Sequence, residues 1–152
     1  MNHNERQIYA IDGVIPVIHP SSFIDQSAVI IGDVVIGANC YIGPNVSLRG
    51  DMANIEIGAG SNIQDNCTLH CMPDIPTIIG EWGHIGHGAV VHSATLAKNV
   101  LVGMNAVVMD NAYVGENSVV AAMAFVKIGM QVPDNTLVAG TPARVIRQLT
   151  EQ

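Results

Sequence analysis

Aliphatic residues recur at every sixth position through most of this 152-residue chain. The longest unbroken run places valine at seven successive sixth positions, which are Val102, Val108, Val114, Val120, Val126, Val132 and Val138. An amphipathic helix has a period of 3.6 residues and a strand has a period of 2, so neither element alone explains this spacing. Repetition at a fixed period is instead typical of a solenoid, in which each unit buries its apolar side against the next.

A period of six fits a coil of three short strands, each of which turns one aliphatic side chain into a triangular interior. The earlier members of the series are Ile24, Ile30, Ile36, Ile42, Leu48, Ile57, Ile63, Leu69, Ile79, Ile85, Val91 and Leu96. Glycine directly follows seven members of the series, and small residues lie four positions after several of them, which suits tight corners. An antiparallel β-sandwich with chance spacing is the alternative, and the seven valines in phase argue against it. The sequence therefore predicts an all-β, single-stranded parallel β-helix of hexapeptide repeats.

Two interruptions and a distinct C-terminus lie within this pattern. Nine positions separate Leu48 from Ile57 and ten separate Leu69 from Ile79, which predicts one loop at each place. Near the end, Thr141-Pro142 is typical of a helix N-cap followed by a first-turn proline. We therefore predict a β-helix domain over residues 1–140 and a C-terminal helical segment over residues 141–152, with a short α-helix from 142 to about 149.

Composition restricts the partners of the chain. Hydrophobic residues make up 49% of the sequence and charged residues only 12%, so part of the outer surface is expected to pack against other subunits. The net charge of −7 argues against nucleic acid or an anionic membrane as a partner. No apolar run approaches the roughly 20 residues of a membrane span. The three cysteines show no paired-motif spacing, so we expect no disulfide framework and a cytoplasmic location.

Four of the six histidines, His70, His84, His87 and His92, fall within 23 residues. His70 directly follows Leu69 and His92 directly follows Val91, so both occupy the same outward slot of the repeat. They should lie one coil apart, at the strand spacing of ~4.8 Å, where two imidazoles can share one metal ion. His87 falls near the corner before that face and would complete a site on a neighbouring subunit about a threefold axis. Three histidines with an open water position are typical of catalytic zinc.

The alternative to metal binding is that these are ordinary surface histidines of a repeat protein. His84 is expected in a corner slot and is interpreted as a non-ligand, with support of the site or contact within the trimer as its alternative roles. Cys71 lies beside His70, but no base free of the metal is evident, so it is expected to be a small buried or half-buried side chain rather than a nucleophile.

With these residues in view, the chain resembles the γ-class carbonic anhydrase family, and within it the branch of phenylacetate-degradation and carnitine-operon proteins. The resemblance covers nearly all of the chain and rests on its motifs, which stand here as S-L-R-G-D (47–51), Q-D-N-C-T-L-H (64–70), G-H-I-G-H-G-A-V-V-H (83–92), G-M-N-A-V-V-M-D (103–110) and A-G-T-P-A-R (139–144). It implies a left-handed β-helix and a homotrimer.

The resemblance also implies a ligand set and supporting roles. The metal, zinc with iron or cobalt as substitutes, would be held by His70 and His92 of one subunit and by His87 of the next. The positions of Arg49 and Asp51 would form an ion pair across the interface. Those of Gln64 and Asp65 would orient the metal-bound solvent, since a fixed hydrogen bond aims its lone pairs.

One departure from the family concerns proton transfer, and it bears on the expected function. Met52 follows Asp51 where the active archetype carries an acidic residue, and the second loop is short with only Asp74. This argues against fast carbonic anhydrase turnover. The first hypothesis is nonetheless a lyase, in which zinc lowers the pKa of bound water to ~7 and the hydroxide converts carbon dioxide to bicarbonate. The alternatives are a metal-dependent acyl-CoA thioesterase, a hexapeptide acyltransferase and an inactive trimeric scaffold.

Overall fold

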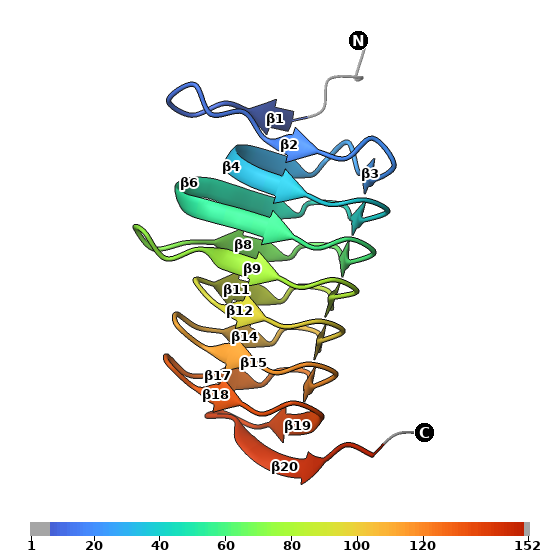
Figure 1. Ribbon diagram of the computed structural model, residues 1–152, viewed down its shortest axis with the longest axis vertical. Helices are drawn as coiled ribbons and strands as arrows, with labels where there is room; N and C mark the ends of the chain where they lie inside the picture. Colours follow the sequence, from blue (N-terminus) through green and yellow to red (C-terminus); the bar gives the residue numbers. More distant parts are fainter. Residues whose placement is uncertain (1–6, 151–152) are drawn as a thin grey trace.

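Short parallel strands wound into a single left-handed column make up residues 7–150, the part of the chain that the computed structural model describes (Figure 1). The column has about seven coils, with β1 at one end and β20 at the other. The predicted parallel β-helix of hexapeptide repeats is confirmed.

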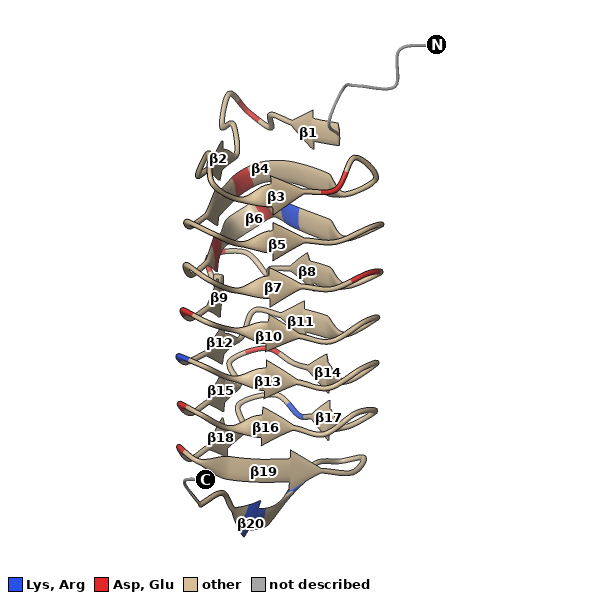
Figure 2. Ribbon diagram, turned by 90° about the vertical axis from the view of Figure 1, so that its right-hand side faces the viewer, with Lys and Arg blue, Asp and Glu red and all other residues tan. Residues whose placement is uncertain are grey.

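Three flat faces enclose the interior, and most coils contribute one strand to each face. Face 1 contains β1 (Gln7–Tyr9), β8 (Thr68–His70), β11 (Val90–His92), β14 (Val107–Val108) and β17 (Phe125–Val126). Face 2 contains β2 (Val17–Ile18), β9 (Thr77–Ile79), β12 (Thr95–Leu96), β15 (Tyr113–Val114) and β18 (Gln131–Val132). Face 3 contains β3 (Phe23–Ile24), β5 (Tyr41–Ile42), β7 (Asn62–Ile63), β10 (His84–Ile85), β13 (Leu101–Val102), β16 (Val119–Val120) and β19 (Thr136–Ala139). Figure 2 looks onto face 3 and shows its strands stacked in order.

The predicted six-residue series forms the interior of the column. Its members are at most 4% exposed, from Ile24 to Val138. The parallel register stacks them directly, so that Ile63 lies on Ile85 and Ile85 lies on Val102. Each fully buried aliphatic side chain of this kind stabilises the fold by about 1.5–3 kcal/mol. The small residues expected at the corners are also buried, namely Cys40, Cys67, Ala89, Ala106, Ala112 and Ser118.

Two long strands, β4 (Val29–Ile36) and β6 (Ser47–Ile57), run from face 1 onto face 2 without a break. Glycines stack where the two strands turn this corner, with Gly32 paired to Gly50. A Cβ atom on Gly50 would lie 2.2 Å from the backbone oxygen of Asp33, so a side chain cannot be placed there without moving the backbone. The first predicted loop, at 49–52, is therefore part of a continuous strand that brings Asp51 around the corner.

The predicted C-terminal helix is wrong. β20 (Arg144–Gln148) turns back and pairs antiparallel with β19, with Ala139 opposite Arg144 and Val138 opposite Val145. The last coil exposes the unpaired edge of β19, which a strand can satisfy and a helix cannot. The β-branched Val145 and Ile146 favour that strand. No helix within residues 7–150 is long and apolar enough to cross a membrane.

Candidate functional site

A single outward column of side chains on face 1 carries the first part of the candidate site. Arg49, His70 and His92 occupy matching positions of β6, β8 and β11. The rings of His70 and His92 have centroids 5.1 Å apart and are tilted by 57°. Nδ1 of His70 lies 3.1 Å from Nε2 of His92. The prediction that these two histidines share one slot on adjacent coils is confirmed.

Each of these two rings is also held at its outer nitrogen by a carboxylate. Nε2 of His70 lies 2.8 Å from Oδ1 of Asp51, and Nδ1 of His92 lies 2.5 Å from Oδ1 of Asp110. An ionised carboxylate can only accept, so each outer nitrogen must donate its N–H. A neutral imidazole carries one N–H only. When both rings are neutral, their inner nitrogens therefore present lone pairs to each other, an arrangement in which both can bind one cation.

The geometry of the pair fits a zinc ion. Two nitrogen ligands at 2.0–2.1 Å from a tetrahedral zinc lie about 3.3 Å apart, close to the 3.1 Å separation of the inner nitrogens of His70 and His92. Carboxylates on the outer nitrogens are the usual partners of zinc-bound histidines, because they fix the tautomer and the ring orientation. Within residues 7–150 of one chain, no group of three or more His, Cys, Asp or Glu side chains is arranged to hold a metal.

Arg49 and Asp51 flank the histidine pair, and they are joined within one chain. Nη1 of Arg49 donates to Oδ2 of Asp51 at 2.6 Å. Partial burial opposes ionisation of Asp51, but hydrogen bonds from Arg49 and His70, with the charge of Arg49, hold the pKa of this carboxyl below its usual value. Asp51 is thus an ionised acceptor that orients His70.

Asp110 is a site residue that the sequence prediction missed. Its carboxylate is buried, at 6% exposure, against His92. The repeat phase places Met109 in the slot of His92, because Val108 pairs with Val91, and Asp110 comes one residue later. The sequence motif at 103–110 ends on this aspartate, and this was the sequence feature that could have indicated its role.

The remaining predicted residues lie on the opposite edge of face 1, at its corner with face 3. Nδ1 of His87 is 3.7 Å from Oδ2 of Asp65, and the His87 side chain is 52% exposed. Four residues lie between His87 and His92, and the first of them, Gly88, is in the turn before β11, so the two histidines lie on different sides of this corner. One chain therefore keeps His87 away from the pair formed by His70 and His92.

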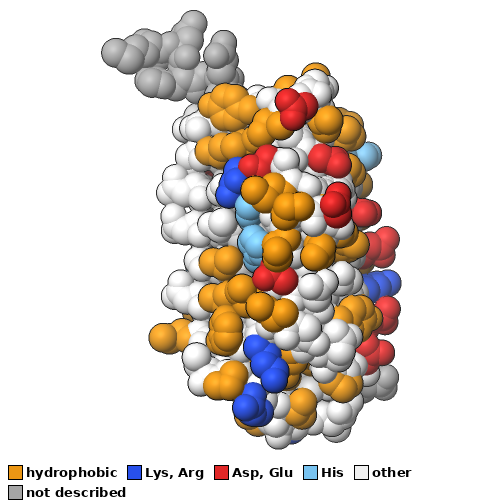
Figure 3. All heavy atoms as spheres, turned by 90° about the vertical axis from the view of Figure 1, so that its left-hand side faces the viewer, with side chains coloured by type: hydrophobic (Ala, Val, Ile, Leu, Met, Phe, Trp, Pro, Cys, Tyr) orange, Lys and Arg blue, Asp and Glu red, His pale blue; other side chains and the backbone are white. Residues whose placement is uncertain are grey.

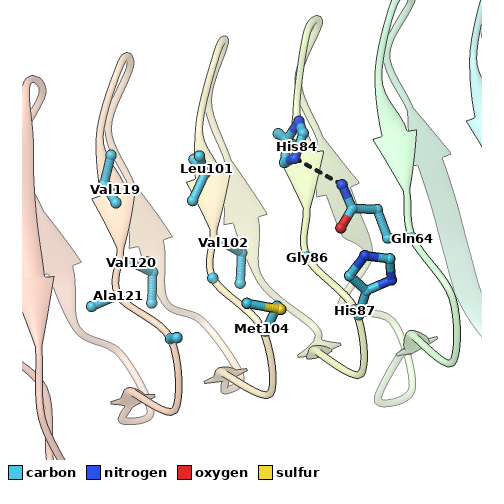
Figure 4. Close-up of a pocket in the computed structure, with 12 residues that line it drawn as sticks. Gln64, His84, Gly86, His87, Leu101, Val102, Met104, Val119, Val120 and Ala121 are labelled. Carbon is cyan, nitrogen blue, oxygen red and sulfur yellow. Dashed lines mark hydrogen bonds between the residues drawn. The ribbon is translucent and has the colours of Figure 1, made fainter.

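Gln64 is held by His84 rather than by the other histidines (Figure 4). Nε2 of Gln64 lies 2.8 Å from Nε2 of His84, while Nδ2 of Asn62 lies 2.9 Å from Nδ1 of the same ring. A neutral ring has only one N–H, so one of the two amides must turn its oxygen toward His84 to satisfy both contacts. The predicted corner position of His84 is wrong: His84 is the first residue of β10, pairs with Asn62 of β7 and points outward from face 3 beside Gln64.

A groove of about 470 Å³ begins at this cluster and continues toward the C-terminal coils (Figure 4). Its polar end is formed by Gln64, His84 and His87. The rest of its lining is apolar or glycine, from Gly86, Leu101, Val102, Gly103, Met104, Val119, Val120, Ala121 and Ala122. The site residues thus form two groups, a histidine–carboxylate pair on one edge of face 1 and a groove headed by His87 on the other.

Known proteins share this architecture. The bacterial transferase hexapeptide model (six repeats) matches residues 15–50 and 93–128. Carnitine operon protein CaiE of Salmonella newport (strain SL254) is 56% identical over 144 residues, which span 95% of this chain and 73% of that protein. A hexapeptide transferase family protein from Anaplasma phagocytophilum has a TM-score of 0.91 at 42% identity, over 95% of this chain and 85% of that one. A hexapeptide-repeat acetyltransferase from Vibrio cholerae, complexed with acetyl coenzyme A, has a TM-score of 0.65 at 26% identity, over 76% and 71%.

Stacked coils of hexapeptide repeats define the class of hexapeptide-repeat proteins. The chain belongs to this family, in the branch that contains the carnitine operon protein CaiE. The branch expected from the sequence motifs is confirmed.

Proposed function

We propose that this chain is a homotrimeric, metal-dependent enzyme that hydrolyses acyl thioesters of coenzyme A at sites between subunits. The observation that carries the proposal is the apolar groove that begins at His87. Its volume is about 470 Å³, and a substrate with a long neutral arm can occupy it. Carbon dioxide needs no such surface. The acetyl coenzyme A bound by the Vibrio cholerae relative supports the same substrate class.

The two separate groups of site residues support the proposed trimer. His70 and His92 offer two nitrogens on one edge of face 1, and His87 is exposed on the other edge. Two different surfaces of one chain that complete each other across copies form a head-to-tail interface, which closes into a ring when the rotation allows it. A threefold ring would bring His87 of one copy to the histidine pair of the next.

Each side chain has a role in this proposed chemistry. When bound, zinc supplies a Lewis acid and an activated water at neutral pH. Asp51 and Asp110 hold the rings of His70 and His92 in the tautomer that leaves both inner nitrogens free. The groove holds the neutral part of the substrate and excludes solvent. Hydrolysis adds water across the thioester: the carbonyl carbon gains OH, the C–S bond breaks and the thiol takes the proton.

Carbon dioxide hydration is the second candidate, and the Arg49–Asp51–His70 chain of contacts favours it. This chain occupies the motif on which the resemblance to γ-class carbonic anhydrases rests. Met52 stands beside it and is half exposed, where an acidic residue would accept protons from the site. A carbonic anhydrase built on this chain would therefore be limited by proton transfer.

The activity test compares three reactions with zinc-loaded protein. Release of the free thiol from a panel of acyl-CoA esters is followed with a thiol reagent, with and without amine or sugar acceptors, and carbon dioxide hydration is followed by stopped flow. We expect thiol release that needs zinc and no acceptor. Release only with an acceptor would make the enzyme a transferase, and hydration without thiol release would make it a carbonic anhydrase; either result overturns the hydrolase proposal.

Mixed trimers test the intersubunit site independently of the substrate. Chains with His87→Ala and chains with His92→Ala each lack one ligand in every site of a uniform trimer. In a random equal mixture, about a quarter of the interfaces would combine an intact histidine pair with an intact His87. We expect zinc binding to return to about that level on co-expression. Unchanged zinc binding by uniform His87→Ala trimers would contradict the proposed intersubunit site.

A further inference from the structure

Charged side chains are distributed unevenly over the column, and the strands of face 3 carry none. On the side of the molecule shown in Figure 3, histidine side chains lie between acidic and basic ones. The strands of face 3, from β3 to β19, contain no Asp, Glu, Lys or Arg (Figure 2). Their ionisable side chains are those of Tyr41 and His84. The hydrogen-bond partners of His84 therefore have a large part in deciding whether its ring is charged.

The side chains of Asn62, Gln64 and His84 close a ring of three contacts. Nε2 of Gln64 lies 2.8 Å from Nε2 of His84 and 3.2 Å from Oδ1 of Asn62. Nδ2 of Asn62 lies 2.9 Å from Nδ1 of His84. Gln64 thus presents the same end of its amide to both partners, whereas Asn62 presents opposite ends. Each contact needs one donor and one acceptor, so the end that Gln64 presents decides the other two contacts.

The number of protons on the imidazole decides whether all three contacts can be made. If Gln64 presents its NH₂ group, Asn62 must present its oxygen to Gln64 and its NH₂ to the imidazole. Both imidazole nitrogens would then have to accept, although even a neutral imidazole carries one N–H. If Gln64 presents its oxygen, Asn62 presents its NH₂ to Gln64 and its oxygen to the imidazole, so both imidazole nitrogens donate. All three contacts are therefore made only by the charged imidazolium with both amides in this second orientation.

The other neighbours of His84 leave this count unchanged. In register, His84 lies between Asn62 of β7 and Leu101 of β13, and the Leu101 side chain has no polar group. The titratable side chains next to these strands are Asp65 and His87, and they contact each other, with 3.7 Å between Oδ2 of Asp65 and Nδ1 of His87. Within residues 7–150, no carboxylate oxygen lies within 4.0 Å of a His84 nitrogen.

We propose that His84 is a positioning residue, whose imidazolium form holds the amide of Gln64 in one orientation; the inference rests on the proposed thioester hydrolysis. With its oxygen bound to His84 and Asn62, Gln64 turns its NH₂ group away from them. Figure 4 shows this amide between the rings of His84 and His87, at the polar end of the groove. The NH₂ group is then a fixed donor for the carbonyl oxygen of the thioester, which gains negative charge in the transition state. His84 and Gln64 keep their protons throughout.

Nuclear magnetic resonance tests the proton count without any reaction. The imidazole nitrogens are observed in protein labelled with nitrogen-15 histidine, and the signals of His84 are identified by their loss in His84→Leu. We expect both nitrogens of His84 to carry a proton at neutral pH. Both protons should remain in Gln64→Glu, because a carboxylate at position 64 accepts from both partners. A single N–H on His84 in the wild type would overturn the proposal.

Three substitutions test the orientation of Gln64 through hydrolysis of acyl-CoA by the zinc-loaded protein. Gln64→Glu removes the donor and keeps the contacts with Asn62 and His84, so kcat should fall by roughly 100-fold, the usual loss for one oxyanion donor. His84→Leu frees the amide to turn and should lower kcat by a smaller factor. His84→Lys should recover most of that loss, because an ammonium has only donors and holds the oxygen of Gln64 as an imidazolium does. Zinc affinity should be equal in the wild type and both His84 variants.

The results distinguish the positioning role from the proposed hydrolase. Equal kcat of the wild type and His84→Leu would overturn the role of His84, and so would a His84→Lys variant as slow as His84→Leu. Lower zinc affinity in both His84 variants would overturn it too, since His84 would then belong to the metal site. Full activity of Gln64→Glu would show that position 64 accepts rather than donates. If no thioester is hydrolysed but both nitrogens of His84 are protonated in the wild type and in Gln64→Glu, the orientation of Gln64 stands and the hydrolase proposal fails.

Discussion

Asp110 accepts a hydrogen bond from Nδ1 of His92 at 2.5 Å, from the strand end one coil further along the column. Asp51 does the same for His70 from the coil before. The two histidines are thus held between two carboxylates in four successive coils, and the protein fixes both rings before any ligand arrives.

Replacing Asp110 by asparagine should weaken zinc binding by about 10–100-fold, because a neutral amide is a poorer acceptor and can turn its NH₂ toward the ring. The affinity of the assembled oligomer is measured by competition with a coloured chelator. Asp74→Asn is the control, since Asp74 is exposed in a loop and contacts neither histidine. Equal zinc affinity of the two variants would mean that Asp110 does not orient His92.

The aliphatic stack should account for most of the stability of the column. Ile85→Ala removes a fully buried side chain between Ile63 and Val102 and should cost about 2–5 kcal/mol in the free energy of unfolding. The matched change Ile146→Ala, in the exposed β20, should stay within about 0.5 kcal/mol. Denaturant titration of both variants checks this, and similar losses would contradict the central role of the stack.

The glycine corner should affect both stability and the site. Gly50→Ala places a Cβ atom 2.2 Å from the backbone oxygen of Asp33 and should cost about 1–3 kcal/mol while displacing Asp51. Gly129→Ala meets no atom within 4 Å and bears only the strain of its φ of +69°, about 1–2 kcal/mol. Zinc affinity distinguishes the two: it should fall in Gly50→Ala alone. Retained affinity in Gly50→Ala would show that the corner does not position Asp51.

The three cysteines should be inert in the folded protein. Cys40, Cys67 and Cys71 are buried and free, and burial raises the pKa of each thiol. A raised pKa leaves less of the reactive thiolate at pH 8, and burial blocks its access to reagent. An aromatic disulfide reagent at pH 8 should label none of them until denaturant is added, and then all three. Rapid labelling of one thiol in the native protein would refute this.

The interior and the histidine pair were predictable because one period governs both. Once Leu69 and Val91 are assigned to the interior, the residue after each must face outward in the same slot, and His70 and His92 are opposite each other in the structure. Because parallel strands stack residue on residue, the relative positions of His70 and His92 are fixed once Leu69 is paired with Val91. Cys71, which was expected to be buried or half-buried rather than a nucleophile, is buried.

The C-terminus and Asp110 were not predictable in the same way. Thr141-Pro142 is a local helix signal, whereas β20 forms because the last coil leaves β19 without a partner, which is a property of the assembled column. Asp110 reaches His92 from outside the shared slot. Val91 and Leu96 are five positions apart, whereas the stacked residues Val108 and Val114 are six positions apart, so the coil of Asp110 has one more residue at this corner. A prediction that assumes six residues between all interior positions does not show this difference between the two coils.

The parallel register also makes distance along the column a matter of counting. Each coil adds about 4.8 Å, so the distance along the axis between two side chains of one column follows from the number of coils between them. Inserting one more coil of three hexapeptides after β14 would move every later coil by that amount and leave His70 and His92 in place. The groove that begins at His87 would lengthen by the same step, so a chain with more or fewer coils in this interval would have a longer or shorter apolar groove and an unchanged histidine pair.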